Sequence, residues 1–94
     1  MQENYLYEQQ WGKETVRVGD LLRTNDEVNA YGPDLTAEDA GWHMVPTGTI
    51  GRLVAMYLPV GVNEDADPDC VVRLADGTLL MGFGSAFEPY KLEV

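Results

Sequence analysis

The residues best able to do chemistry in this chain are carboxylates, and they gather in two stretches. Residues 20–39 hold six carboxylates and one arginine, for a net charge of −5, and residues 64–76 hold five carboxylates and one arginine, for −4. Dense carboxylates can bind a hard cation, act as general acids and bases, or present negative charge to a basic surface. Each of these roles makes a different demand on the neighbouring residues.

A cation site is the first possibility, because residues 63–69 read Asn-Glu-Asp-Ala-Asp-Pro-Asp and place side-chain oxygens close together. A calcium loop of the EF-hand kind also needs Gly at its sixth position and Glu at its twelfth. Counted from Asp65, those positions hold Cys70 and Asp76, and Pro68 restricts the backbone between them. We therefore expect a solvated acidic loop with no dedicated metal site and no cofactor. Adventitious cation binding there stays open.

Catalysis is the second possibility, and the sequence argues against it. His43 is the only histidine and Cys70 the only cysteine, so no zinc ligand set is present. A Cys–His dyad would need a thiolate of low pKa and a third orienting group, whereas Cys70 begins an apolar run typical of core. Carboxylate neighbours such as Glu38 and Asp39 would need burial to separate their pKa values. We therefore expect that this protein is not an enzyme.

Size and charge limit the function further. Ninety-four residues suffice for one domain with a modest core. The net charge of −10 and pI near 4.2 exclude direct binding to nucleic acid or an anionic membrane, which requires clustered Lys and Arg. No apolar run approaches the roughly 20 residues that span a bilayer, and the first residues do not resemble a secretory signal. A single cysteine allows no intrachain disulfide, so we expect a cytoplasmic protein.

The pattern along the chain predicts an all-β domain. Residues 1–13 form an N-terminal extension, in which the Tyr5 and Tyr7 spacing suits a short strand. Whether this extension adds a strand, exchanges between protomers or stays loose is open.

The predicted strands cover residues 14–24 with a bend at 19–20, then 48–57, 70–75, 78–83 and 90–94. Residues 25–46 form a long loop, with a single helical turn after Thr36. Residues 58–68 form a second loop. Asp76-Gly77 predicts a tight hairpin whose two turn residues both take positive φ, and residues 84–89 a short turn.

This layout resembles the SH3-like small barrel over residues 14–94. The resemblance rests on Val-Gly-Asp-Leu at 18–21, Thr-Gly-Thr-Ile-Gly-Arg-Leu at 47–53, Val-Val-Arg-Leu-Ala-Asp-Gly-Thr at 71–78, and Phe-Glu-Pro-Tyr-Lys-Leu-Glu-Val at 87–94. The cadence is similar to the ferredoxin–thioredoxin reductase variable chain, the small peripheral barrel protein of photosystem I and KOW-type or Mind-bomb-type domains. It implies a five-stranded barrel with a long acidic first loop, and it indicates fold rather than function.

Two departures separate this chain from the better-known members. The aromatic signature of domains that bind proline-rich peptides is absent, and six basic residues are too few for nucleic-acid binding. In SH3-like barrels the first two loops lie beside each other, which implies that the two acidic stretches flank one surface with aromatic anchors. The binding residues we expect are Asp26, Glu27, Tyr31, Asp34, Glu38, Asp39, Trp42, His43, Glu64, Asp65, Asp67 and Asp69.

The sequence therefore predicts a non-catalytic acidic module that binds a basic protein surface. Its sharper form is a nucleic-acid mimic that inhibits a nucleic-acid-binding enzyme, as small anti-CRISPR and anti-defence proteins of phages and mobile elements do. The alternative is a structural or regulatory subunit of a larger enzyme complex, by analogy with the reductase and photosystem barrels. The oligomeric state stays open.

Overall fold

The computed structural model describes residues 3–31, 43–59, 61, 63 and 66–91, with the side chains of residues 3, 4, 31, 43 and 59 left out. This part of the chain is all-β, as the sequence predicts, and adds one 3₁₀ turn. Its elements are β1 (Glu3–Tyr5), β2 (Glu8–Trp11), β3 (Glu14–Arg17), β4 (Leu21–Thr24), β5 (Val28–Tyr31), β6 (His43–Val45), β7 (Ile50–Pro59), β8 (Asp69–Arg73), β9 (Leu79–Phe83), η1 (Gly84–Ala86) and β10 (Phe87–Pro89).

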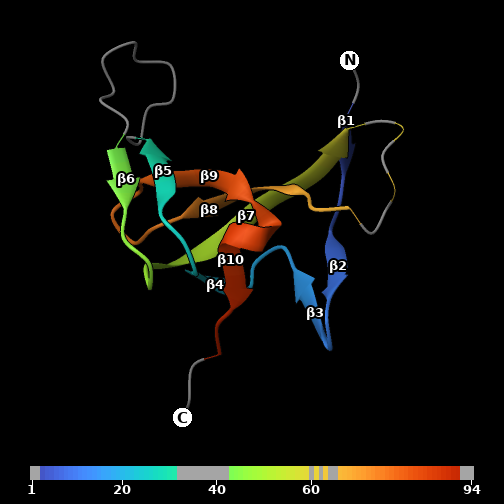
Figure 1. Cartoon of the computed structure of the whole chain (residues 1–94), viewed down its shortest axis with the longest axis horizontal. Helices are drawn as coiled ribbons and strands as arrows, with labels where there is room; N and C mark the ends of the chain where they lie inside the picture. Colours follow the sequence, from blue (N-terminus) through green and yellow to red (C-terminus); the bar gives the residue numbers. More distant parts are fainter. Residues whose placement is uncertain (1–2, 32–42, 60, 62, 64–65, 92–94) are drawn as a thin grey trace.

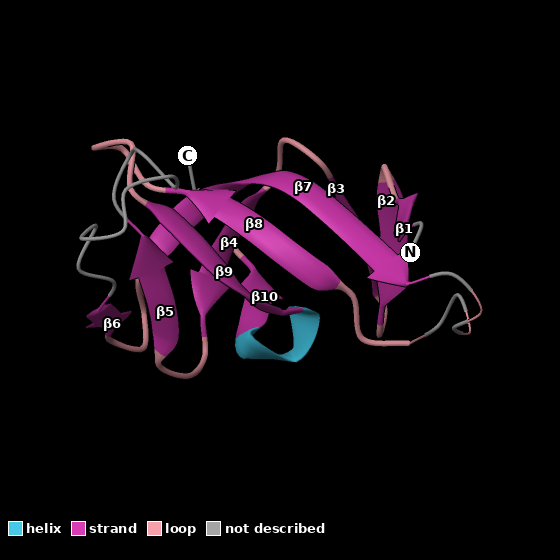
Figure 2. Ribbon diagram, turned by 90° about the horizontal axis from the view of Figure 1, so that it is seen from above, coloured by secondary structure: helices cyan, strands magenta, loops and turns pink. Residues whose placement is uncertain are grey.

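One curled antiparallel sheet makes up most of the fold and closes about halfway into a barrel (Figures 1 and 2). Its strand order is β10-β4-β7-β8-β9-β5-β6, and β1 pairs with the far end of β7. The long strand β7 slips register between Leu53 and Ala55, opposite Val72 and Val71 of β8. A bulge of this kind bends a strand and increases its twist, which helps the sheet to curl.

The core lies on the concave side of this sheet. Along β8, Cys70 and Val72 are buried and the residues between them are less so, as period-two alternation requires. Cys70 therefore belongs to the core, which confirms the expectation from its sequence context. The buried apolar cluster consists of Val16, Leu22, Val28, Ala30, Val45, Leu53, Met56, Cys70, Val72, Leu80 and Phe87.

Residues 14–24 do not form one bent strand, contrary to expectation. β3 pairs with β2 in a separate two-stranded sheet, and β4 lies between β7 and β10 in the main sheet. The break comes from a tight turn in which Gly19 takes φ +104° and the Asp20 carboxylate accepts a hydrogen bond from the Arg17 amide at 2.9 Å. A side chain rarely adopts that φ, so glycine permits the reversal.

The expected loop over residues 25–46 is wrong at both of its ends, where β5 and β6 form. β5 pairs with β9 on one side and β6 on the other. The expected helical turn after Thr36 lies outside the described residues. The extension adds strands within this chain, since β1 pairs with β7 and β2 pairs with β3. The last strand in the described part of the chain is β10. Residues 90 and 91 of the expected strand 90–94 are not in a strand, and the rest of that strand lies outside the described residues.

The β8–β9 hairpin forms where Asp76-Gly77 predicts it, with a different turn. Gly77 has φ +92°, whereas no described residue other than glycine has positive φ, so the two-residue turn expected there is wrong. The Leu74 amide donates to the Thr78 carbonyl, so this pair closes the hairpin and the loop between them is longer than the expected two residues. The Asp76 carboxylate accepts a hydrogen bond from the Thr78 amide at 2.9 Å, and this bond lowers the pKa of Asp76.

None of the described residues belongs to a helix long and apolar enough to cross a membrane.

Candidate binding groove

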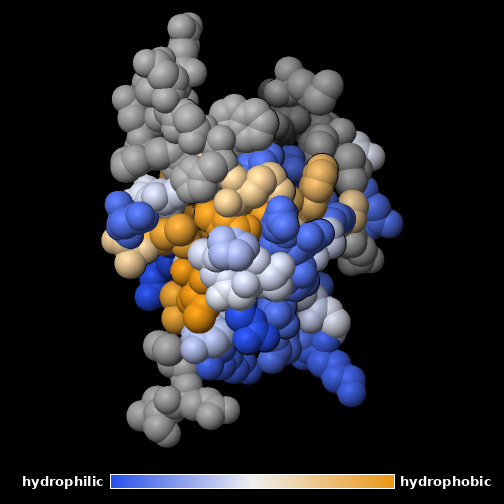
Figure 3. Space-filling model, turned by 60° about the vertical axis from the view of Figure 1, so that its left-hand side comes forward, coloured by the Kyte–Doolittle hydropathy of each residue, from blue (hydrophilic) through white to orange (hydrophobic). Residues whose placement is uncertain are grey.

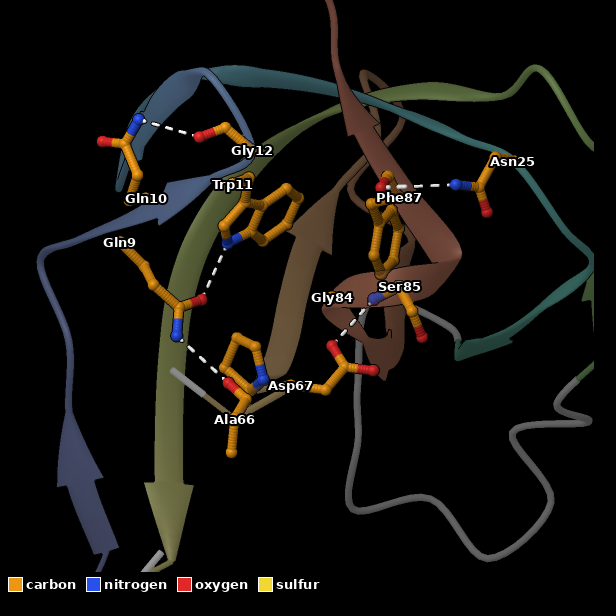
Figure 4. A pocket seen from close by; sticks show the side chains of 11 residues that line it. Gln9, Gln10, Trp11, Gly12, Asn25, Ala66, Asp67, Gly84, Ser85 and Phe87 are labelled. Atoms are coloured by element: carbon orange, nitrogen blue, oxygen red, sulfur yellow. Dashed lines mark hydrogen bonds between the residues drawn. The ribbon is translucent and has the colours of Figure 1, made fainter. Parts of the chain in front are cut away.

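Three segments distant in sequence enclose a shallow groove of about 490 Å³ (Figure 4). The end of β2 supplies Trp11, the segment before β8 supplies Asp67, and η1 supplies Ser85. Asn25 and Phe87 close the side opposite the indole. The groove thus combines an aromatic ring, a carboxylate and amide or hydroxyl groups around one hollow, the usual composition of a small recognition site.

Trp11 is held in a fixed orientation at the groove. Its indole Nε1–H donates a hydrogen bond to Oε1 of Gln9 at 2.7 Å, and Nε2 of the same Gln9 donates to the Ala66 carbonyl at 3.1 Å (Figure 4). The ring also packs against the core cluster. Because its N–H is occupied by Gln9, what Trp11 offers a ligand is its ring surface.

Asp67 stands across the groove and is fixed by η1. Its Oδ1 accepts a hydrogen bond from the Ser85 amide at 2.8 Å, and the Gly84 amide donates to the Pro68 carbonyl at 2.8 Å. A Cβ atom on Gly84 would lie 2.9 Å from Oδ1 of Asp67 and 3.1 Å from Cζ2 of Trp11. Glycine at position 84 therefore allows the indole and the carboxylate to approach from two sides of one turn.

The groove is electrostatically one-sided. Among the described residues that line it, Asp67 carries the one formal charge, and that carboxylate forms no ion pair with any described residue. Three of the basic side chains pair elsewhere, in Arg17–Glu8, Arg23–Glu88 and Lys91–Glu14. A ring face beside an uncompensated carboxylate suits a cationic side chain, which is attracted by both.

The structure brings together some of the expected binding residues. Asp69 lies directly opposite Phe83 in the sheet, and Glu27 shares a hollow with Phe83, so one member of each acidic stretch flanks this end of β9. Tyr31 lies opposite Leu79, at the other end of β9, and His43 is near it through its pairing with Ala30.

Of the remaining expected binding residues, two are described by the structure and six are not. Asp26 lies in the turn before β5, where it accepts a hydrogen bond from the Glu27 amide. Asp67 lies in the groove described above. The other expected binding residues fall outside the described part of the chain: Asp34, Glu38, Asp39, Trp42, Glu64 and Asp65.

Sequence reasoning did not propose Trp11, Asn25, Ser85 or Phe87 as site residues. Trp11 does pack on the core, yet it also lines the groove. Its neighbours Gln9, Gln10 and Gly12 are polar or small, and an aromatic side chain in such a context is the one signal that suggests a surface role.

A reactive thiol and a metal site are the two kinds of reactive centre that the described residues could form. Burial, together with the charges of Asp67 and Asp69, raises the pKa of Cys70 to about 12, so its thiol stays protonated near neutral pH and is a poor nucleophile. No group of three or more His, Cys, Asp or Glu side chains within the described residues is arranged to hold a metal ion.

Comparison with protein-family models, with curated proteins and with solved structures found no match to this chain.

Proposed function

We propose that this protein is a non-catalytic acidic binding module that captures a basic side chain of a partner protein in the groove between Trp11 and Asp67. The observation that carries the proposal is the Asp67 carboxylate, which forms no ion pair with any described residue and lines the same groove as the Trp11 ring, with no Lys or Arg among the described residues of the groove. A net charge of −10 adds long-range attraction for a basic partner and predicts binding that weakens as salt rises.

Fixed geometry supports this proposal over simple counter-ion attraction. Asp67 is oriented by the Ser85 amide, and the Trp11 ring by Gln9. Since both groups are held before a ligand arrives, little side-chain entropy is lost on binding. Arginine suits the site better than lysine, because its planar guanidinium stacks on an aromatic ring while its N–H groups donate to a carboxylate.

The curled sheet also supports an SH3-like barrel as the framework of the module, with the N-terminal hairpin as an addition to it. The nucleic-acid mimic is a narrower form of the same function. It depends on regular spacing among acids that include Asp34, Glu38, Asp39, Glu64 and Asp65, which lie outside the described residues. The groove proposal does not require them.

A titration with single-residue probes tests the groove. The ¹⁵N-labelled protein is titrated with acetyl-Gly-Arg-Gly-amide and with the same peptide carrying citrulline, which has the shape of arginine without its charge. We expect chemical-shift changes at the Trp11 indole N–H and the Ser85 amide, with the arginine peptide binding about tenfold more tightly, a difference of about 1.4 kcal/mol. The lysine peptide falls between the two.

Two substitutions of equal charge provide the control. Asp67→Asn removes the groove carboxylate and keeps an oxygen for the Ser85 amide, whereas Asp76→Asn removes one charge at the distant β8–β9 hairpin. We expect the first to abolish the preference for arginine over citrulline and the second to preserve it. Equal effects of the two substitutions would show that only net charge matters, and the groove proposal would then be wrong.

A further inference from the structure

A second surface lies on the convex face of the main sheet and shares no residue with the groove. The strand register sets Tyr5 opposite Tyr57, Tyr57 opposite Asp69, and Asp69 opposite Phe83, across β1, β7, β8 and β9. Residues directly opposite each other in antiparallel strands share one face of the sheet. The rings of Tyr5 and Tyr57 confirm this, with centroids 5.8 Å apart. We call these four residues the aromatic row, and Figure 2 shows β7, β8 and β9 side by side.

The two end members of the aromatic row are exposed to an extent unusual for such side chains. Tyr5 is 69% exposed and Phe83 is 61% exposed. Two residues further along the strands, Met81 and Met44 lie on either side of Asn29, and Met44 is 50% exposed. Figure 3, which brings the β5–β6 side forward, shows apolar side chains gathered on that side among hydrophilic ones. Exposed apolar side chains grouped on one face of a sheet are typical of a protein interface.

The surface is also hollowed beside the aromatic row. A depression of about 290 Å³ is lined by Met44, Met81 and Phe83, with Glu27 among its lining residues. Methionine side chains adapt their shape to a partner, and a hollow receives a protruding apolar group. The depression is therefore suited to bind an apolar side chain of another protein.

Asp69 decides what kind of partner fits. It occupies the middle of the aromatic row and is partly buried, and its carboxylate forms no hydrogen bond or ion pair with the described residues. An apolar partner alone would leave this carboxylate dehydrated and unpaired, which is costly. A second copy of this chain, joined face to face, would bring Asp69 and Glu27 near their own counterparts and would add the repulsion of two chains of net charge −10.

We propose that the convex face docks an apolar surface of a partner protein that carries one Lys or Arg positioned to meet Asp69. The aromatic row and the two methionines supply the buried contact, and Asp69 selects the partner and fixes its register. This surface stands independently of the groove and is tested by different residues.

The experiment titrates the ¹⁵N-labelled full chain with the synthetic peptide acetyl-Leu-Lys-Leu-Lys-Leu-amide. Two matched peptides replace either the lysines by glutamate or the leucines by serine. We expect shifts at the amides of Val71, Met81 and Phe83, and binding at least tenfold tighter for the Leu-Lys peptide than for either control. Tighter or equal binding of the serine peptide, or shifts confined to Trp11 and Ser85, would overturn the proposal.

Matched variants separate the surface from general effects. Phe83→Ser and Asp69→Asn should each weaken binding of the Leu-Lys peptide about tenfold. Tyr7→Ser alters a tyrosine that is 83% exposed outside the aromatic row, and Asp76→Asn removes a distant charge, so both should bind as the unmodified chain does. A dispersed spectrum verifies that each variant folds. Sedimentation of Asp69→Asn provides a last check, since a stable dimer formed through this face would show that the occupant is a second copy and would overturn the proposal.

Discussion

Asp67 and Ser85 are joined by a 2.8 Å hydrogen bond from the Ser85 amide to Oδ1 of the carboxylate. This bond ties the first part of the second acidic stretch to the 3₁₀ turn after β9, although 18 positions separate the two residues in sequence. Asp67 consequently has a structural role through one oxygen and leaves the other, Oδ2, without a hydrogen-bond partner among the described residues. The two roles can be separated by substitution.

Asp67→Ala should destabilise the fold more than Asp67→Asn. The alanine removes the acceptor of the Ser85 amide, while the asparagine oxygen can still accept it. We expect a loss of about 1 kcal/mol in the free energy of unfolding for alanine and a smaller loss for asparagine, measured by urea denaturation. Equal stability of the two variants would mean that the bond contributes nothing.

Gly51 on β7 has less room for a side chain than Gly82 on β9. A Cβ atom there would lie 2.6 Å from Cγ1 of Val72 and 2.9 Å from the carbonyl oxygen of Arg73, whereas a Cβ on Gly82 would have its nearest neighbour, Cγ1 of Val28, at 3.3 Å. Gly51→Ala should therefore lower the free energy of unfolding by about 1–3 kcal/mol and Gly82→Ala by less. Thermal denaturation of the two variants side by side measures this. The reverse order would show that β7 and β8 can separate more easily than the packing implies.

Thr24 is a buried polar residue that connects β4 to the turn before β7. Its Oγ1 donates to the Pro46 carbonyl at 3.0 Å and accepts from the Thr49 amide at 3.0 Å. Thr24→Val keeps the volume of the side chain and leaves the Thr49 amide without its acceptor. The Pro46 carbonyl still accepts a hydrogen bond from the Thr49 hydroxyl, so the amide is the group that loses its partner. We expect a loss of about 1–3 kcal/mol. Thr15→Val, at an exposed position, serves as the control and should change stability little.

Cys70 should resist thiol reagents in the folded protein. Its pKa is raised from 9.0 to about 12, so the native state holds its proton at pH values where the unfolded chain has released it. The contribution of this group to stability is therefore complete below about pH 9 and declines as the pH rises from there toward about 12.

The rate of reaction with an aromatic disulfide reagent at pH 8 tests this account of Cys70. It should be roughly a thousandfold lower for the native protein than for the urea-unfolded chain, because reaction requires an opening of several kcal/mol. Rapid labelling of the native protein would contradict the burial of Cys70.

The sequence predicted the parts of the fold that local patterns determine. The Asp76-Gly77 pair between the expected strands 70–75 and 78–83 indicated the β8–β9 hairpin, and the apolar run after Gly48 indicated β7. The sequence did not predict the strand β5, because its four residues follow Asn25 and Asp26 and precede Gly32-Pro33, which are all turn signals. What makes it a strand is pairing with β9, some 50 positions away. Such pairing leaves no local trace in the sequence.

The groove was partly predictable for the same reason. The clustering of carboxylates made Asp67 a candidate binding residue, and nothing local suggests that it lines one groove with Trp11, 56 positions away. The two residues line one groove because the β2–β3 hairpin turns at Gly12 and because Gly84 has no side chain to fill the space near both of them. An arrangement that depends on two distant glycines cannot be inferred from charge pattern or periodicity.

The central claim concerns where a cationic side chain lies when it binds. Intermolecular nuclear Overhauser effects between the Trp11 ring protons and the δ-methylene protons of acetyl-Gly-Arg-Gly-amide measure this directly. We predict that these effects appear with the unmodified protein and disappear with Asp67→Asn. Effects that persist in that variant, or that arise only at Tyr5 and Phe83, would contradict the assignment of the groove as the cation site.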